Sequence, residues 1–458
     1  MERNEERPPT DPADVRPSPP VGLPWRPTAR SARLASLPLG YAGRSAARIG
    51  RRLLGQSAEA AAAEFQRRTA EQLFSVLGEL KGGAMKIGQL LSVFEAALPP
   101  VLVAPYRTAL TRLQESAPAL GFDAVRIHLA EELGPGWEES FEAFGRTPVA
   151  AASIGQVHRA RWKDGREVAV KIQYPNAREA LLGDYDRIST LMRALTLLYP
   201  GLEIGPMVAE LKDRVAEELD YRLEARAQRA FAEAYRGDPD IHVPGVVADT
   251  SRVLVTEWLP GRPLAELVTD GTPAERDAVG LRFARFLLSG PARAGLLHAD
   301  PHPGNFRLLP DGRLGVLDFG AVKRLPDGLP RTLGTLQRLA DEGDFEGAEA
   351  VLREAGFLRT AAPVGAEAVS AFLGPLAAPT AGEEFHFTRA WLQEELARAA
   401  SPGTRKLIAR LNLPPSYVLI NRAVTAGSAV LCQLDCTVPF RAEALRWLPG
   451  FAPDRSAA

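Results

Sequence analysis

The chain has 458 residues, more than one domain usually holds, which predicts two lobes with extensions. Its 55 Lys and Arg residues balance 56 Asp and Glu residues for a formal net charge of −1, so no general affinity for nucleic acid is indicated. Hydrophobic residues make up 46% of the chain, enough for a sizeable folded core.

Residues 1–28 are rich in Pro, Glu, Asp and Arg, which predicts a disordered tail and does not match a signal peptide. No uninterrupted apolar run reaches the roughly 18 residues that cross a bilayer. The most apolar late segment, 417–431, is interrupted by Asn421 and Arg422. The sequence therefore predicts a cytoplasmic protein without a transmembrane segment, and it allows peripheral attachment to a membrane.

Residues 29–55 are basic and amphipathic, with no acidic residue between Asp14 and Glu59. Such a segment can lie on an anionic membrane surface. The alternative is a helix packed on the rest of the protein with its arginines in water. Pro38 and Gly40 interrupt the helical pattern and weaken the membrane interpretation, so both stay open.

Residues 58–98 have apolar side chains at three- and four-residue spacing, which predicts a helix that ends at Pro99. Lys86 and Gln89 are three residues apart and would share one face of it. Taken alone, such a pair is typical of a solvated helix surface.

The segment Val168-Ala169-Val170-Lys171 follows a turn at 163–165 and resembles the strand that carries the nucleotide-binding lysine of protein kinases. Where such kinases have a Gly-rich loop, this chain reads Ala-Ala-Ala-Ser-Ile-Gly-Gln-Val over 150–157. Alanine resists the positive φ angles that glycine adopts, so we expect a stiffer loop.

A lysine in this place needs an acidic partner on a packed helix. The cluster Glu218-Leu219-Asp220, followed by Glu224, offers candidates, although alone it is also typical of a solvated helix face. The unusually long interval between Lys171 and Glu224 predicts inserted helices over 174–214. Residues 253–259 are expected to form a strand into a hinge whose backbone, near Glu257 and Leu259, would bind a nucleotide base.

Residues 298–305 read His-Ala-Asp-Pro-His-Pro-Gly-Asn, and Asp318-Phe319-Gly320 follows. Asp300 and Asn305 keep the five-residue step of the kinase catalytic loop, in which the Asp meets the substrate hydroxyl and the Asn holds a metal ion. Helices are expected over 281–288, 332–340 and 345–355. Cys432 and Cys436 are predicted to be buried thiols on one side of a late helix, typical of a reducing compartment.

Together these motifs resemble the UbiB-type atypical kinases, the AarF/UbiB/ADCK group, over about residues 70–325. The resemblance implies an α+β, two-lobed protein-kinase-like fold with an N-terminal helical extension and a largely helical C-lobe. The expected parts are a tail (1–28), the extension (29–114), an N-lobe with inserted helices (115–262) and the C-lobe (263–458). The implied cofactors are ATP or ADP and Mg²⁺.

The roles implied by the resemblance are catalytic for Asp300, Lys171 and Glu224, metal-binding for Asn305 and Asp318, and regulatory for Lys86, Gln89, Glu218 and Asp220. The nucleotide would contact Ala150, Ala151, Ala152, Ser153, Ile154, Gly155, Gln156, Val157, Ala169, Lys171, Glu257 and Leu259. The Lys86 helix would fold over the active site and face Glu218.

Two departures from protein kinases bear on the substrate. Ala299 replaces the Arg that reads activation-loop phosphate, and no Ala-Pro-Glu follows Asp318 at the usual distance. We therefore expect an atypical kinase or ATPase that supports isoprenoid-quinone or lipid metabolism, with a lipid or quinone-pathway partner and no nucleic acid. The alternatives are a protein kinase with restricted partners and a non-catalytic scaffold switched by ATP. An oligomer is compatible with the sequence.

Overall fold

The structure is a computed structural model of the chain, and it describes residues 120–152, 154–175, 177, 219–358, 364–399 and 412–452. All of them lie within one compact unit, Leu80–Ala458. The predicted tail, the basic segment 29–55, and most of the predicted inserted helices lie outside the described residues. The division into four parts is therefore still a prediction.

The first described part is built on a six-stranded sheet in which β2 pairs with β3 and the remaining order is β1-β3-β4-β7-β6. All of its pairs are antiparallel. Its strands are β1 (Phe141–Phe144), β2 (Ala150–Ala152), β3 (Gly155–Trp162), β4 (Glu167–Gln173), β6 (Val246–Asp249) and β7 (Val253–Glu257). The predicted hinge strand thus ends at Glu257.

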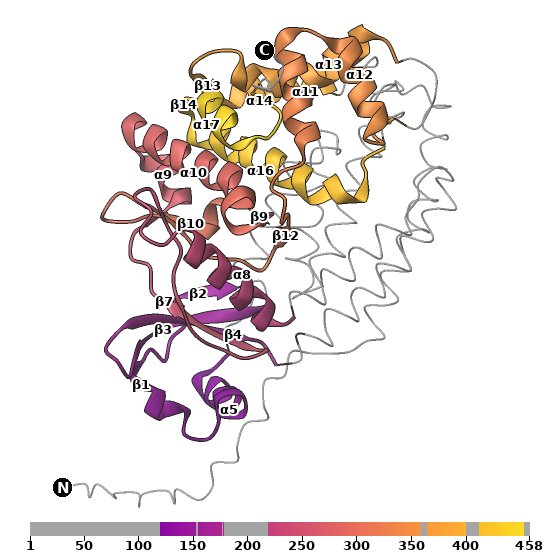
Figure 1. Ribbon diagram of the computed structural model, residues 1–458. Coiled ribbons are helices and arrows are strands. Elements are labelled where there is room, and N and C mark those ends of the chain that lie inside the picture. The colour runs from indigo at the N-terminus through magenta and orange to yellow at the C-terminus, as the bar shows by residue number, and fades with distance from the viewer. Residues whose placement is uncertain are drawn as a thin grey trace, which may run out of the picture. The chain divides into compact units, whose positions relative to one another are not determined.

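Alternation along β4 separates the two faces of this sheet. Val168, Val170 and Ile172 are fully buried on one face, where they pack against α5 (Phe122–Leu133). Because successive strand residues point to opposite sides, Ala169 and Lys171 face the other way. That second face is covered by α8 (Tyr221–Ala234), which packs against β7. Figure 1 shows the sheet between these two helices.

The Ala-rich segment is not an open loop. Ala150–Ala152 form β2, which pairs in register with the start of β3 to make a tight hairpin. The carbonyl of Ile154 in the turn accepts the N–H of Tyr174 at 2.8 Å, which ties the turn to the end of β4. Gly155 lies against β4 so closely that a Cβ atom would stand 2.1 Å from the Ile172 carbonyl oxygen.

The second described part is mostly helical, with small sheets in the order β5-β11-β10-β8 and β9-β12. A buried aromatic core that includes Phe283, Phe286 and Phe306 joins α8, α10 and β10. The long helix α10 starts with a capping box between Thr272 and Glu275. The elements are β5 (Ile241–His242), β8 (Arg262–Pro263), α9 (Leu264–Asp270), α10 (Pro273–Ala294), β9 (Leu296–His298), β10 (Phe306–Leu308), β11 (Leu314–Val316) and β12 (Val322–Arg324).

The C-terminal elements are α11 (Arg331–Glu342), α12 (Phe345–Glu354), α13 (Ala366–Ala377), β13 (Phe385–Phe387), α14 (Arg389–Ala399), α16 (Val418–Leu434), β14 (Cys436–Val438) and α17 (Phe440–Trp447). Short 3₁₀ turns lie at Trp137–Ser140, Pro303–Asn305, Ala378–Thr380 and Pro415–Tyr417. The helices expected over 281–288, 332–340 and 345–355 are confirmed, and so is the α+β class.

The prediction for the two cysteines was partly wrong. Cys432 and Cys436 are both buried and unpaired, as expected. They do not share a helix, because α16 ends at Leu434 and Asp435 turns the chain with φ 51° before Cys436 begins β14.

Among the described residues, one helix, Pro415–Leu434, is long and apolar enough to cross a membrane by length and composition. A core helix passes the same test, and 44% of the apolar window is buried inside the protein. Its residues Leu419, Ile420 and Ala423 are among those buried.

The close approach at the Ala-rich turn gives a test of the fold. Gly155→Ala should lower the free energy of unfolding by about 3 kcal/mol, because its Cβ would overlap a carbonyl held in the β3–β4 ladder. Chemical unfolding measures this loss. Gly121→Ala is the control, since no atom lies within 4 Å of its Cβ position and its φ is −61°. Equal stability of the two variants would contradict the described hairpin.

Candidate active site

Three segments meet at the ammonium group of Lys171. Lys171 of β4 donates to both carboxylate oxygens of Glu224 in α8, each at 2.9 Å. It also donates to Oδ2 of Asp318, in the loop after β11, at 3.2 Å. The predicted pairing of Lys171 with Glu224 is thus present, and Asp318 joins it.

Burial and charge act in opposite directions on this lysine. Burial lowers the pKa of Lys171, but the neighbouring carboxylates of Asp318 and Glu224 outweigh it and raise the pKa well above 10.5. The ammonium is therefore charged at neutral pH. With both acids ionised the cluster carries one net negative charge, which favours the arrival of a cation.

The start of α8 is set by Asp220, one of the predicted regulatory residues. Its side chain accepts the N–H of Arg222 at 3.0 Å and caps the helix. The next residue, Tyr221, is buried, and its ring lies 5.0 Å from the Lys171 nitrogen. Its hydroxyl has no hydrogen-bond partner among the described residues. The other three predicted regulatory residues, Lys86, Gln89 and Glu218, lie outside them.

Aromatic packing fixes the loop that carries Asp318. Phe319 is buried, with its ring 5.1 Å from that of Phe231 in α8 and 5.6 Å from that of His298. Nε2 of His298 donates to the Asp318 carbonyl at 2.5 Å. Burial lowers the pKa of His298, which favours the neutral ring, and its bond to the Asp318 carbonyl gives it a structural role.

The catalytic loop is held by its own backbone. The Asn305 side-chain N–H donates to the Asp300 carbonyl at 3.0 Å, and the His302 N–H donates to the same oxygen at 2.8 Å. Nδ1 of His302 accepts the N–H of Gly304 at 3.1 Å, so this histidine shapes the loop. Because the amide nitrogen of Asn305 is engaged, its oxygen points elsewhere and is the atom that a cation would bind.

The residues predicted to contact the nucleotide do not all lie on the same face of the sheet. Val157 stands opposite Lys171 in the β3–β4 register and shares its face. Gln156 instead stands opposite Ile172, and its side-chain oxygen accepts the Leu120 N–H at 2.7 Å on the α5 side. The side chain of Gln156 therefore points away from Lys171, and only its backbone is available for the nucleotide contact, which stays a prediction. Ser153 lies outside the described residues.

The predicted hinge residues, Glu257 and Leu259, lie at and just beyond the end of β7. The Glu257 N–H donates to the Gly245 carbonyl at 2.9 Å, and its carboxylate accepts from His242 at 3.2 Å. This side chain is engaged with the strand's neighbours, so only its carbonyl suits the predicted base contact. Leu259 is buried just beyond the strand, and no bond from its N–H is found within the described residues.

One residue at the site was not predicted. Arg422 of α16 contacts the Asp300 carboxylate, with 3.0 Å between Nη2 and Oδ1. In the sequence, Arg422 stands out only as an interruption of an apolar segment. A charged residue within an otherwise apolar core helix was the available signal, since such a charge needs a buried partner.

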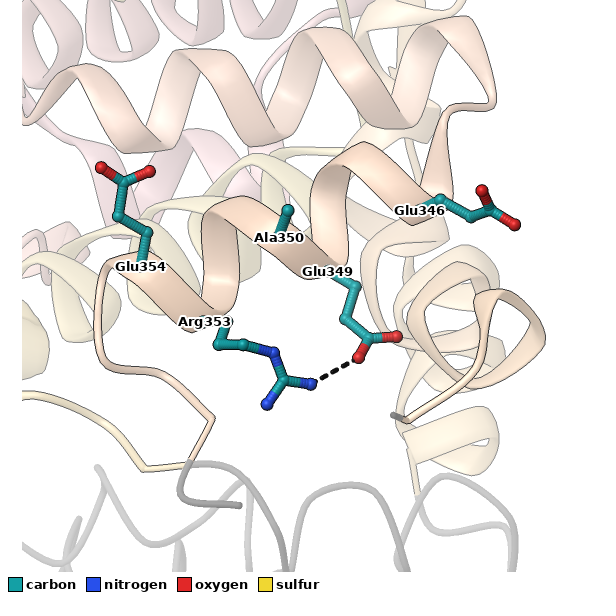
Figure 2. Close-up of a pocket in the computed structure, with 5 residues that line it drawn as sticks. All are labelled: Glu346, Glu349, Ala350, Arg353 and Glu354. Carbon is teal, nitrogen blue, oxygen red and sulfur yellow. Dashed lines mark hydrogen bonds and ion pairs between the residues drawn. The ribbon is translucent and has the colours of Figure 1, made fainter. Parts of the chain in front are cut away.

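A separate pocket lies on α12 and holds none of the predicted site residues. Figure 2 shows its lining, which comes from this one helix: Glu346, Glu349, Ala350, Arg353 and Glu354. The Glu349 carboxylate accepts from Arg353 at 2.6 Å and from the Val364 and Gly365 N–H groups at 3.1 Å. These bonds give the Glu349 carboxylate a structural role, because it ties α12 to the backbone at Val364 and Gly365.

The donor set suits Mg²⁺ better than a metal caged by protein. Within the described residues, no group of three or more His, Cys, Asp or Glu side chains could hold an ion. Mg²⁺ is commonly bound by one or two protein oxygens together with substrate phosphates. The Asp318 carboxylate and the Asn305 amide oxygen fit that pattern.

The chain is similar to known kinase-like proteins. Residues 112–348 match the ABC1 atypical kinase-like domain. The chain is 32% identical over 297 residues to the mitochondrial atypical kinase coq-8 of Caenorhabditis elegans, across 63% of this chain and 39% of that protein. It is 31% identical over 294 residues to the mitochondrial atypical kinase COQ8 of Saccharomyces cerevisiae, across 63% of this chain and 57% of that protein. The match thus spans about half the length of these relatives.

A solved structure is also similar. It is the complex of Rv3197 with erythromycin from Mycobacterium tuberculosis, and it superposes with a TM-score of 0.69 at 45% sequence identity. The similarity covers 87% of this chain and 100% of the other chain. The kinase-like fold expected from the motifs is confirmed by these matches.

The shared ammonium makes a stability test possible. Lys171→Met would leave Glu224 and Asp318 facing each other without a cation, so we expect unfolding to become about 3 kcal/mol easier at pH 7. Since the folded pKa of Lys171 is raised, its contribution is complete at neutral pH and would be lost only as pH rises through that elevated pKa. The difference from wild type should shrink as pH falls and the carboxylates protonate, and burial, which raises the pKa of Glu224, moves this change above the usual carboxylate range.

Chemical unfolding across pH measures this difference. Lys163→Met is the matched control, because Lys163 is exposed in the turn before β4, and it should change stability by about 0.5 kcal/mol at most. A Lys171→Met protein as stable as the control would show that the cluster contributes nothing to the fold.

Proposed function

The chain belongs to the ABC1 atypical kinase-like family, the UbiB-type atypical kinases, and from this premise we propose that it binds ATP or ADP with Mg²⁺ and transfers or hydrolyses the terminal phosphoryl group. One observation carries the proposal. Lys171, Glu224 and Asp318 form a single bonded cluster, with Asp300 and Asn305 on the loop that His298 links to Asp318.

Nucleotide binding would redistribute the bonds of this cluster. Lys171 keeps Glu224 as its anchor and exchanges its longer contact, to Asp318 at 3.2 Å, for the α- and β-phosphates. Asp318 and Asn305 would then hold Mg²⁺, which would supply charge neutralisation at the phosphates.

The transfer step uses the loop residue Asp300. The proton of the acceptor hydroxyl or water passes to its carboxylate, and the acceptor oxygen bonds to the γ-phosphorus. The bond from that phosphorus to the bridging oxygen breaks, and ADP leaves with the electron pair. Catalysis here consists mostly of positioning and charge stabilisation, which suits a site built from preformed hydrogen bonds.

The sequence lacks two features of protein kinases that bear on the phosphoryl acceptor. It has neither the Arg of His-Arg-Asp, which reads activation-loop phosphate, nor the Ala-Pro-Glu motif, so control by phosphorylation and a peptide acceptor are not supported. We therefore infer a role in isoprenoid-quinone or lipid metabolism, as the family resemblance implies. Lys86, Gln89 and Glu218 as regulators, and segment 29–55 as a contact for anionic membranes, are parts of the same proposal.

The test is Mg²⁺-dependent ATP hydrolysis by the purified chain, with and without anionic liposomes. We expect Asp318→Asn to lose activity by about 10²-fold or more, because the metal loses its carboxylate. The control is Asp327→Asn, since Asp327 is exposed and bears no predicted role. Stimulation by liposomes in wild type would support a membrane-associated acceptor.

The same assay separates the alternatives. Asp300→Asn should abolish turnover while leaving nucleotide affinity within about threefold, because Asp300 acts in the transfer step. Cellular function that survives Asp300→Asn but not Lys171→Ala would favour the ATP-switched scaffold. Stoichiometric phosphate on a defined protein, lost in Asp300→Asn, would favour the restricted protein kinase.

We propose erythromycin as a second ligand, because the similar solved structure is a complex with erythromycin. That structure is 45% identical to this chain and matches 87% of it, which favours a shared binding site. We expect titration of this chain with erythromycin to give a saturable binding signal, with the heat-unfolded chain as the control. A signal indistinguishable from the unfolded control would remove this candidate and leave the nucleotide proposal intact.

A further inference from the structure

The catalytic loop itself provides no fixed positive charge. Residues 298–305 contain no Lys or Arg. His298 is buried and its Nε2 donates to the Asp318 carbonyl, and Nδ1 of His302 already accepts the Gly304 N–H. Lys171, bonded to Glu224 and Asp318, would turn to the α- and β-phosphates in the proposed function. Charge on a transferring phosphoryl group is spread over three oxygens, and a cation on the side of the catalytic loop would add to the neutralisation that Mg²⁺ and Lys171 supply.

The structure brings such a cation from far along the chain. Arg422 is 122 residues beyond Asp300, and its Nη2 lies 3.0 Å from the Asp300 carboxylate. Its side chain is only 15% exposed and that of Asp300 only 23%, so both charges are largely withdrawn from water. A pair in such surroundings is screened far less than a surface pair.

Packing holds Arg422 in this place. Its neighbours Ile420 and Ala423 are buried against Leu297, the residue before His298, and against Leu329. Helix α16 therefore rests directly on the strand that leads into the catalytic loop, as Figure 1 shows for α16 and β9. Among the described residues no second hydrogen bond of the guanidinium is found, and Arg has five N–H donors in a planar fork.

We propose that Arg422 is a further residue of the phosphoryl-transfer site: it orients the Asp300 carboxylate and directs its remaining N–H groups to the oxygens of the transferring phosphoryl group. This inference rests on the proposed function. It also extends the site beyond residues 112–348, the part that matches the kinase-like domain, into the C-terminal helices.

The experiment measures single-turnover release of phosphate from Mg-ATP by the full chain. Arg422→Gln should lower the rate at saturating ATP by about 10²-fold, the usual loss for one charge-stabilising donor, while ATP affinity changes by less than about threefold. Arg422→Lys should recover only part of the rate, because an ammonium lacks the planar fork. Arg389→Ala is the control, since Arg389 is an exposed arginine at the start of α14.

Chemical rescue separates a transfer role from a structural one. Methylguanidine should raise the rate of the Arg422→Ala variant by at least about tenfold, because it can enter the space beside Asp300. It should not raise the rate of the Asp300→Asn variant. Folding of each variant is checked by its thermal midpoint. A rate for Arg422→Gln equal to or above wild type, or a folded Arg422→Ala that no guanidine rescues, would overturn the inference.

The two proposals fail in different ways. Wild type that neither binds Mg-ATP nor releases phosphate would defeat the proposed function. Wild type that turns over while Arg422→Gln does so at the same rate would defeat only the role of Arg422.

Discussion

Three distant segments are held together by one ammonium group, that of Lys171. The carboxylate of Glu224 is buried, and burying an unpaired charge costs several kcal/mol. Strand β4, helix α8 and the loop after β11 are thus positioned by one another, since none can leave without stranding a charge. In the proposed function a nucleotide would take over part of this cluster, so its binding would be coupled to the local structure.

A second ion pair repeats this logic at the catalytic loop. Asp300 and Arg422 are both largely withdrawn from water, and each is carried by an element with its own apolar anchor. Between the two pairs, Phe319 packs against Phe231 and His298, so ring contacts connect the loop of Asp318 with the loop of Asp300. These contacts fix the centre of the site, which suits the proposed phosphoryl transfer by positioning.

The Ala-rich turn shows how local chemistry and tertiary contact combine. Alanine predicted a stiffer element than a glycine loop, and the structure adds the reason why it is held: the Ile154 carbonyl is bonded to Tyr174, and Gly155 lies against Ile172. Glycine is kept at the position where backbone approaches backbone. The neighbouring alanines pair as a strand, which needs no positive φ.

Short-range pattern determined much of this protein. The motif at 168–171 after its turn predicted the strand that carries Lys171, and spacing in 298–305 predicted the loop that carries Asp300 and Asn305, because both depend on residues that are neighbours in the chain. Tertiary structure decided what depends on distant partners. It set Gln156 on the α5 face, ended α16 before Cys436, and brought Arg422 to Asp300 across 122 residues. Which charge pairs with which is fixed by packing between elements, and a sequence read along its length does not contain those distances.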